Sequence, residues 1–161
     1  MNETTITRRE LLASLTQSAA GALALGTLLP LRAEAAAPTL ITIYKDPSCG
    51  CCTKWVDHLR SAGLRTLVHD RTDMDSLKDS LGVPASLRSC HTAVVGKFVV
   101  EGHVPAADVK KLIAKPPKGI VGLAVPDMPA GSPGMEMPGR RDRYAVIAFF
   151  TSGTTSVFAR H

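Results

Sequence analysis

The chain has few aromatic residues and no long run of charge of one sign. Phe, Trp and Tyr make up 4% of its 161 residues, and 19 basic against 14 acidic side chains leave a net charge of +5. The basic residues are scattered along the chain. Proteins that bind nucleic acid concentrate basic side chains on one surface and often stack bases on aromatic rings. The composition therefore predicts no nucleic-acid partner.

The chain also lacks an uninterrupted apolar run long enough to span a membrane. Its apolar N-terminal stretch, residues 19–29, is rich in Ala and Gly, and Gly21, Gly26 and Pro30 interrupt or end it. A spanning helix needs about 20 consecutive, predominantly apolar residues. We therefore expect no stable insertion in a membrane once this segment has been removed.

The same stretch has the features of an export signal. Arg8 and Arg9 precede it, and small residues at 33–37 provide suitable cleavage sites. Paired arginines before a moderately apolar segment are typical of a twin-arginine signal. We predict that residues 1–37 form a twin-arginine-like signal and that the protein is located in the periplasm. Because that compartment is oxidising, unprotected cysteines are expected to pair or to hold a metal there.

Cysteines are few, but three of the four lie together. Cys49, Cys51 and Cys52 fall between a predicted strand at 40–44 and a predicted helix at 53–61. C-x-x-C spacing at a strand-to-helix turn indicates redox or metal chemistry. The helix N-terminus carries a partial positive charge that favours the thiolate. Disulfide chemistry needs only two sulfurs, so the additional Cys51 favours a soft metal.

The apolar patterns along residues 38–114 predict an α/β domain. A helix follows each of the first two strands, and another follows a hairpin. The predicted strands are residues 40–44, 64–70, 90–95 and 98–103, and the predicted helices are residues 53–61, 73–81 and 105–113. This order, β-α-β-α-β-β-α, is that of the thioredoxin-like fold.

Residues 115–161 differ in composition from the preceding domain. They hold three of the five methionines in a segment rich in Pro and Gly, and residues 144–150 and 155–159 then predict a closing β-hairpin. We predict a Met/Pro/Gly-rich C-terminal extension that packs on the same domain. Its methionines either fill gaps in the core or offer thioethers to copper.

The fourth cysteine, Cys90, is expected to face the other three. In a thioredoxin-like fold the loop before the third strand faces the C-x-x-C turn and normally ends in a proline. Here Cys90 occupies the end of that loop, and Pro84 lies six residues earlier. Four converging sulfurs leave open a disulfide pair, a zinc site, an iron–sulfur cluster or a copper–thiolate cluster.

The spacing of the cysteines helps to choose among these sites. Zinc prefers two separated C-x-x-C pairs. The familiar iron–sulfur spacings are absent, although four cysteines match the ligand count of such a cluster. We expect Cys51 to point away from Cys49 and Cys52. Bridging thiolates shared among several Cu(I) ions would tolerate the crowding, so the spacing favours copper.

Two of the five histidines are candidates for the same site. His91 adjoins Cys90, and His103 follows the hairpin at the same end of the predicted sheet. Each could bind a metal or orient a ligand. Asp46 is expected to cap the turn or to raise the basicity of a ligand. The other histidines are expected elsewhere: His58 on a solvated helix face, His69 in a structural position and His161 at the frayed end of the chain.

Four segments resemble the CopG family of periplasmic copper-resistance proteins. They are residues 46–52 (DPSCGCC), 89–93 (SCHTA), 100–105 (VEGHVP) and 131–136 (GSPGME), and the resemblance covers roughly residues 39–161. It implies a thioredoxin-like domain with a C-terminal extension, and a copper cluster bridged by cysteine sulfurs. The implied copper ligands are Cys49, Cys51, Cys52 and Cys90, with His91, His103, Met135 and Met137 as auxiliary candidates.

The resemblance implies copper binding and the interconversion of Cu(I) and Cu(II) in copper resistance, with copper-efflux or other copper-handling proteins as partners. Whether the chain is an enzyme, a copper oxidoreductase, is left open. Two alternatives also stay open. One is a thiol–disulfide oxidoreductase in which Cys49 attacks and Cys52 resolves the mixed disulfide. The other is a passive copper chaperone without a redox role.

Overall fold

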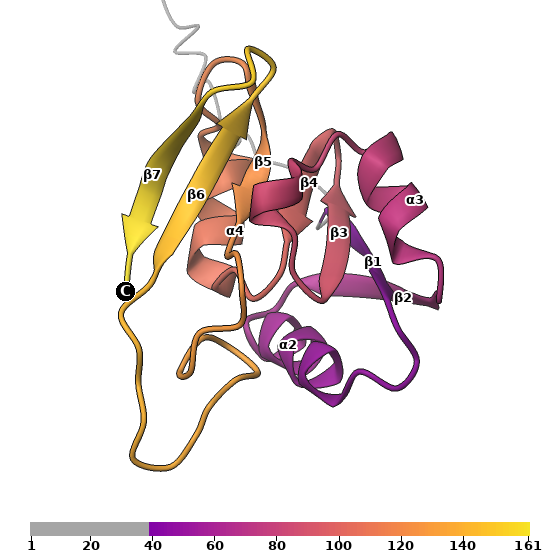
Figure 1. Cartoon of the computed structure of the whole chain (residues 1–161), viewed down its shortest axis with the longest axis vertical. Helices are drawn as coiled ribbons and strands as arrows, with labels where there is room; N and C mark the ends of the chain where they lie inside the picture. The colour runs from indigo at the N-terminus through magenta and orange to yellow at the C-terminus, as the bar shows by residue number, and fades with distance from the viewer. Residues whose placement is uncertain (1–38) are drawn as a thin grey trace, which may run out of the picture. The chain divides into compact units, whose positions relative to one another are not determined.

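The architecture is a seven-stranded β-sheet in the order β2-β1-β3-β4-β5-β6-β7 (Figure 1). The computed structural model describes residues 39–161, and the export signal predicted at residues 1–37 lies outside this part of the chain. The strands are β1 Leu40–Lys45, β2 Arg65–Asp70, β3 His91–Val95, β4 Phe98–Glu101, β5 Ile120–Ala124, β6 Ala145–Phe150 and β7 Thr155–Arg160. The helices are α2 Gly50–Ser61, α3 Met74–Ser80, the short 3-10 helix η1 Ala85–Leu87, and α4 Ala106–Ala114.

The first four strands and three α-helices confirm the predicted order of elements. Strands β1 and β2 are parallel and are joined through α2, whereas β3 and β4 form an antiparallel hairpin beside β1. The predicted mixed α/β class is therefore confirmed. The C-terminal hairpin is also confirmed, because β6 and β7 pair in an antiparallel manner.

The start of α2 differs from the prediction. The helix begins at Gly50, not at residue 53, because Cys49 acts as its N-cap and the Cys49 side chain accepts a hydrogen bond from the Cys52 N–H. Cysteine is not among the preferred capping residues, so local sequence gave little sign of this start. As a consequence, Cys51 and Cys52 belong to the first helical turn, and their sulfurs project from a rigid element.

Strand β5 was not predicted from the sequence. It pairs in parallel with β4 and antiparallel with β6, so it joins the C-terminal hairpin to the sheet. Four of its five residues are buried, and it therefore lacks the alternation that marks a half-exposed strand. Figure 1 shows the long segment 125–144, which follows β5, running below the sheet towards α2.

Two apolar clusters cover the two faces of the sheet. On one face, Trp55 of α2 and Leu112 of α4 are fully buried in a cluster that also contains Ile43 of β1. On the other face, Leu87 of η1 packs in a cluster with Val99 of β4. Burial of each such side chain contributes about 1.5–3 kcal/mol. The larger cluster fixes α2, and with it the cysteines at its N-terminus.

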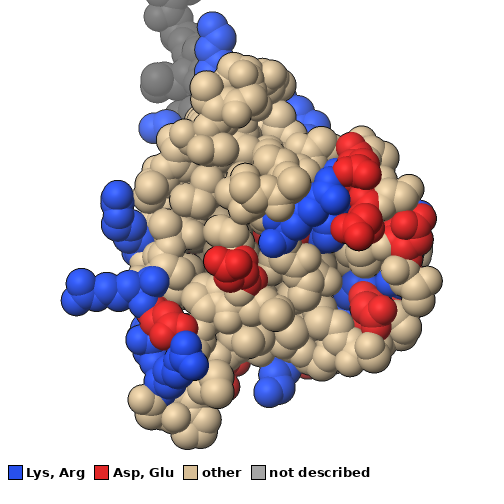
Figure 2. All heavy atoms as spheres, viewed as in Figure 1, with Lys and Arg blue, Asp and Glu red and all other residues tan. Residues whose placement is uncertain are grey.

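Charged side chains of both signs are interleaved on the face shown in Figure 2, where basic and acidic residues lie next to one another. Arg88 forms ion pairs with both Asp75 and Asp79. Within residues 39–161, no helix has the length and apolar character needed to cross a membrane.

Candidate metal centre

The three clustered cysteines meet at the N-terminus of α2. The Cys49 and Cys52 sulfurs form a disulfide bond with a length of 1.99 Å. The Sγ of Cys51, which is a free thiol, lies 3.4 Å from the Sγ of Cys49. The expectation that Cys51 points away from the other two is therefore wrong. All three residues belong to the N-cap and first turn of one helix, which keeps their side chains together.

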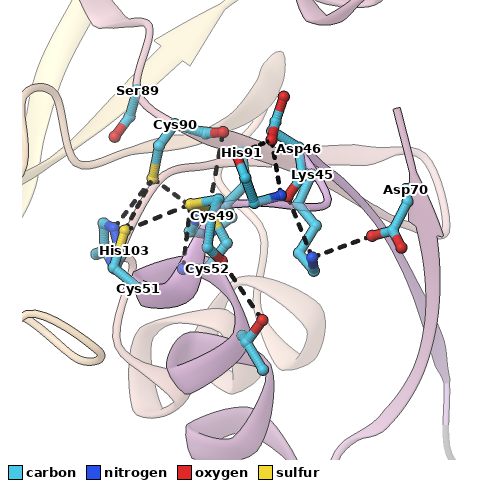
Figure 3. The surroundings of a disulfide bond; sticks show 12 residues. Lys45, Asp46, Cys49, Cys51, Cys52, Asp70, Ser89, Cys90, His91 and His103 are labelled. Carbon is cyan, nitrogen blue, oxygen red and sulfur yellow. Dashed lines mark hydrogen bonds and ion pairs between the residues drawn. A yellow bond between two sulfur atoms is a disulfide. The ribbon is translucent and has the colours of Figure 1, made fainter. Parts of the chain in front are cut away.

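Cys90 approaches these sulfurs from the loop between η1 and β3 (Figure 3). Its Sγ lies 3.9 Å from the Sγ of Cys51. The sulfurs of all four cysteines lie within 4.8 Å of one another. The structure thus brings together two sequence regions about forty residues apart, as the order of the elements predicted.

Two imidazoles also contact the sulfur of Cys90. The Cys90 Sγ is 3.2 Å from Nδ1 of His91 and 3.1 Å from Nε2 of His103. Both histidines are fully buried. The Nδ1 of His103 lies 2.8 Å from the carbonyl oxygen of Pro133, to which it must donate. The Nε2 lone pair of His103 is therefore directed at the Cys90 sulfur.

His91 is held by packing more than by hydrogen bonds. Its ring lies 4.3 Å from the Trp55 ring and 4.9 Å, edge-on, from that of His103. Among the buried side-chain atoms of residues 39–161, its Nε2 stands out because no hydrogen-bond partner reaches it. Buried polar atoms are usually satisfied, so this imidazole is kept in the site at a cost in stability.

Burial controls the protonation of these groups. Burial, and next the neighbouring Cys51 sulfur, raise the pKa of the Cys90 thiol to about 12. Burial also lowers the pKa of His91 well below its usual range and lowers that of His103. At neutral pH the site therefore presents neutral imidazoles, which are the form that binds metal. A metal ion would displace the Cys90 proton, because thiols coordinate as thiolates.

A buried ion pair supports the Cys90 loop from the opposite face of the sheet. Lys78 of α3 lies 2.5 Å from Oε1 of Glu101, and both side chains are almost completely buried. The Thr92 hydroxyl donates to Oε2 of Glu101 over 2.7 Å, while Lys78 donates to the same hydroxyl. Glu101 Oε1 also accepts the backbone N–H of Ser89 over 2.6 Å. Because Ser89 precedes Cys90, this network holds the thiol in position.

The segment between β5 and β6 covers the site. The backbone at Gly134 lies so close to α2 that a Cβ there would meet the Cys51 carbonyl oxygen at 2.7 Å and the Trp55 nitrogen at 2.9 Å. Gly134 also has φ +86°, which side-chain-bearing residues rarely adopt. The neighbouring Pro133 carbonyl orients His103. The part of the C-terminal extension around Gly134 therefore packs against the first turns of α2, which carry Cys51.

The two methionines predicted as auxiliary ligands differ in position. Met135 directly follows Gly134 and is partly buried. Met137 is 50% exposed and lines a surface hollow together with Glu136 and Arg140. The structure therefore brings the backbone before Met135 to the cysteines, whereas Met137 lies at the surface.

The remaining polar candidates have structural contacts. Asp46 accepts hydrogen bonds from the backbone and hydroxyl of Ser48 and so caps the turn before α2. His58, expected on a solvated face, instead accepts the Ala106 N–H at the start of α4 over 3.0 Å. His69 is exposed and stacks on Tyr44. His161 was expected at a frayed end, but its ring stacks on Tyr144 and its Nε2 lies 2.7 Å from Asp108.

The sequence did not identify Lys78, Thr92 and Glu101 as residues that support the site. The charge of Glu101 at the end of an apolar strand, two residues before His103, was the available signal. Taken together, the centre offers sulfur and imidazole donors in a largely buried setting. Thiolate sulfur is a soft donor that selects Cu(I), and imidazole also suits copper.

Comparisons with known proteins agree with this chemistry. The family model described as "Protein of unknown function, DUF411" matches residues 87–135, which include Cys90, His91 and His103. A search of the curated proteins finds no match. A solved structure of copper resistance protein CopG, form 2, is 46% identical with a TM-score of 0.74, and the match covers 78% of this chain and 99% of that one.

A second solved structure, of form 1 of copper resistance protein CopG, is 47% identical. Its TM-score is 0.73, and the match covers 78% of this chain and 98% of that one. Such identity over almost the whole length of both solved chains confirms the resemblance of the four sequence segments. The chain belongs to the CopG family of copper resistance proteins.

Proposed function

We propose that this protein binds copper through cysteine thiolates in a polynuclear site and interconverts Cu(I) and Cu(II) in copper resistance. The observation that carries the proposal is the convergence of the sulfurs of Cys49, Cys51, Cys52 and Cys90 within 4.8 Å. When the cysteines are reduced, four thiolates so close together repel one another. Several Cu(I) ions bridged by shared sulfurs would neutralise that charge.

The imidazoles extend this donor set. Ring nitrogens of His91 and His103 lie 3.2 and 3.1 Å from the Cys90 sulfur, so a metal bound by Cys90 would be within reach of nitrogen donors as well as sulfur. We include Met135 and Met137 as auxiliary ligands, with Met135 the nearer candidate. Asp46 would act indirectly, by capping the turn that precedes Cys49. A donor set of mixed sulfur and nitrogen can accommodate both oxidation states of copper.

The first test is copper content. The reduced full chain is loaded anaerobically with Cu(I), excess metal is removed against a competing chelator, and copper per chain is counted by mass spectrometry. We expect several copper ions per chain, and a loss of most of them in the Cys51→Ser, Cys90→Ser variant. A wild-type chain that retains no copper against the chelator would contradict the proposal.

A thiol–disulfide oxidoreductase is the second candidate, and the Cys49–Cys52 disulfide favours it. In that function Cys49 would attack and Cys52 resolve the mixed disulfide. The exposure of these residues agrees, because Cys49 is partly exposed and Cys52 is fully buried. Insulin reduction that is unaffected by Cys51→Ser and Cys90→Ser would support this function over copper chemistry.

A passive chaperone differs from the proposed function only in redox chemistry. Reversible oxidation and reduction of the bound copper, followed by voltammetry, separates the two, because a passive chaperone shows no such cycling.

For location and organisation, we propose a twin-arginine-like export signal at residues 1–37, a thioredoxin-like domain at 38–114 and a C-terminal extension at 115–161. The protein would then act in the periplasm and pass copper to efflux or other copper-handling proteins. Fusion of residues 1–37 to a reporter that is active only after twin-arginine export tests the signal directly.

A further inference from the structure

The four cysteines are divided into two pairs of different state. Cys49 and Cys52 are joined as a disulfide, while Cys51 and Cys90 are free thiols in the same structure. The free sulfurs lie 3.9 Å apart, and that of Cys51 is 3.4 Å from Cys49 (Figure 3). Formation of the disulfide therefore uses half of the sulfurs and leaves the other half at the centre.

The pair that stays free is accompanied by both imidazoles. Cys90 is within 3.2 Å of a ring nitrogen of His91 and of His103. Cys51 and Cys90 with these rings provide two sulfur and two nitrogen donors without any contribution from the disulfide. Such a soft set suits Cu(I). With the disulfide formed, the chain thus keeps a donor set for a metal ion that is smaller than the set of the fully reduced chain.

The positions of the bonded sulfurs suit electron donation to a metal that arrives from solvent. Cys49 is partly exposed, whereas Cys52 is fully buried behind it. Cys49 is also the N-cap of α2 and accepts the Cys52 N–H, and a helix N-terminus favours the thiolate that does the reducing. Copper at Cys49 would be adjacent to Cys51, from which the smaller site begins.

We propose that Cys49 and Cys52 act as an internal two-electron donor that reduces two Cu(II) ions, and that Cys51, Cys90, His91 and His103 retain Cu(I) afterwards. Each of the two thiolates gives up one electron, each Cu(II) gains one, and one sulfur–sulfur bond forms. Of the two Cu(I) ions formed, one is retained and the other is released to solution. Two protons are released when the reaction starts from thiols. The inference rests on the proposed copper-binding function and adds to it the source of the electrons.

The test begins with the fully reduced full chain, anaerobic and free of other reductants. Two equivalents of cupric sulfate are added, and the Cu(II) signal is followed by electron paramagnetic resonance. We expect two Cu(II) ions to be consumed per chain and the free thiols to fall from four to two. Peptide mapping by mass spectrometry is expected to find the Cys49–Cys52 linkage, and one Cu(I) is expected to stay bound per chain.

Two double variants separate electron donation from retention. In Cys49→Ser, Cys52→Ser, the Cu(II) signal is expected to persist, while added Cu(I) is still held at one ion per chain, which also shows that this variant is folded. In Cys51→Ser, Cys90→Ser, retention of Cu(I) is expected to be lost, with the metal recovered by a chelator.

Three results would overturn the inference. The first is equal consumption of Cu(II) by the wild type and by the Cys49→Ser, Cys52→Ser variant. The second is a product disulfide that contains Cys51 or Cys90, or that joins two chains. The third is a wild-type chain that binds Cu(I) when reduced and yet leaves the Cu(II) signal unchanged. That third result leaves the proposed function standing, whereas failure of the reduced chain to bind Cu(I) at all removes the proposed function itself.

Discussion

Nε2 of His103 faces the sulfur of Cys90 at 3.1 Å, while Nδ1 of the same ring donates to the Pro133 carbonyl over 2.8 Å. Histidines that bind metals are commonly oriented by such a bond from the second ring nitrogen. The arrangement fixes the tautomer before any metal arrives. It also links the segment after β5, which supplies Pro133, to the loop before β3, which supplies Cys90.

Removal of this imidazole should weaken copper retention. We expect His103→Ala to lower the Cu(I) affinity by at least about 10–100-fold, the loss typical for a group that merely supports a ligand. Competition with a Cu(I) chelator measures the change. His69→Ala is the matched control, because His69 is exposed and stacks on Tyr44 away from the sulfurs. Equal affinities for the two variants would exclude His103 from the site.

The buried Lys78–Glu101 pair should be costly to break and less costly to replace. Lys78→Met leaves the Glu101 carboxylate buried without its cation, so we expect a loss of about 3–5 kcal/mol in the free energy of unfolding. In the double variant Lys78→Met, Glu101→Leu, no charge is left behind, and the loss should be much smaller. Urea unfolding measures both. If the loss in the double variant equals the sum of the losses in Lys78→Met and in Glu101→Leu alone, the two groups are not coupled.

The order of the strands and the position of Cys90 could be predicted because local patterns carry them. Apolar runs mark β1 to β4, and the topology then places the loop before β3 opposite the C-x-x-C turn. Strand β5 was missed because its residues are buried on both faces and Gly122 interrupts the run. A Cβ at Gly122 would collide with the Val99 carbonyl oxygen, so only the neighbouring strand explains this glycine.

Other features depend on contacts that no local pattern reports. Lys78 lies in a short helix whose other charged residues are exposed, and only the approach of Thr92 and Glu101 makes it a buried residue. His58 is similar, since its partner Ala106 lies almost fifty residues away. The direction of Cys51 was predicted wrongly because the helix starts at Gly50, three residues earlier than the predicted start.

The close approach of the covering segment can be tested at Gly134. We expect Gly134→Ala to reduce stability and copper retention, because the new methyl group would collide with backbone atoms of α2. Gly139→Ala is the control in the same segment: Gly139 has φ +71°, but a Cβ there meets nothing within 4 Å. Positive φ alone costs about 1–2 kcal/mol. A thermal unfolding midpoint no lower for Gly134→Ala than for Gly139→Ala would contradict the tight packing.

The two methionines should contribute unequally to copper retention. Leucine replaces methionine with little change in volume, so a change in affinity reports the thioether. We expect Met135→Leu to lower the Cu(I) affinity more than Met137→Leu, because Met137 is half exposed in the surface hollow. Chelator competition on both variants provides the comparison. A larger effect at Met137 would mean that the segment rearranges when copper binds.

The stability of the metal-free protein should depend on pH through His58. Burial lowers the pKa of His58 below 6.5, with partial opposition from the Glu136 carboxylate. The unfolded chain therefore takes up the proton more readily than the folded chain. The contribution of His58 to the free energy of unfolding is complete above about pH 6.5. It decreases as the pH falls towards the lowered pKa of His58 in the folded chain. His91 and His103, whose pKa values burial also lowers, act in the same direction.

His58→Gln isolates this contribution, because the amide oxygen of glutamine can accept the Ala106 N–H without titrating. We expect the variant to lose less stability than the wild type between pH 7.5 and pH 5.5 in urea unfolding of the metal-free chain. His69→Gln, at an exposed histidine, should follow the wild type. If His58→Gln and the wild type lose stability in parallel, protonation of His58 does not compete with its bond to Ala106, and the pH dependence belongs to the histidines of the metal centre.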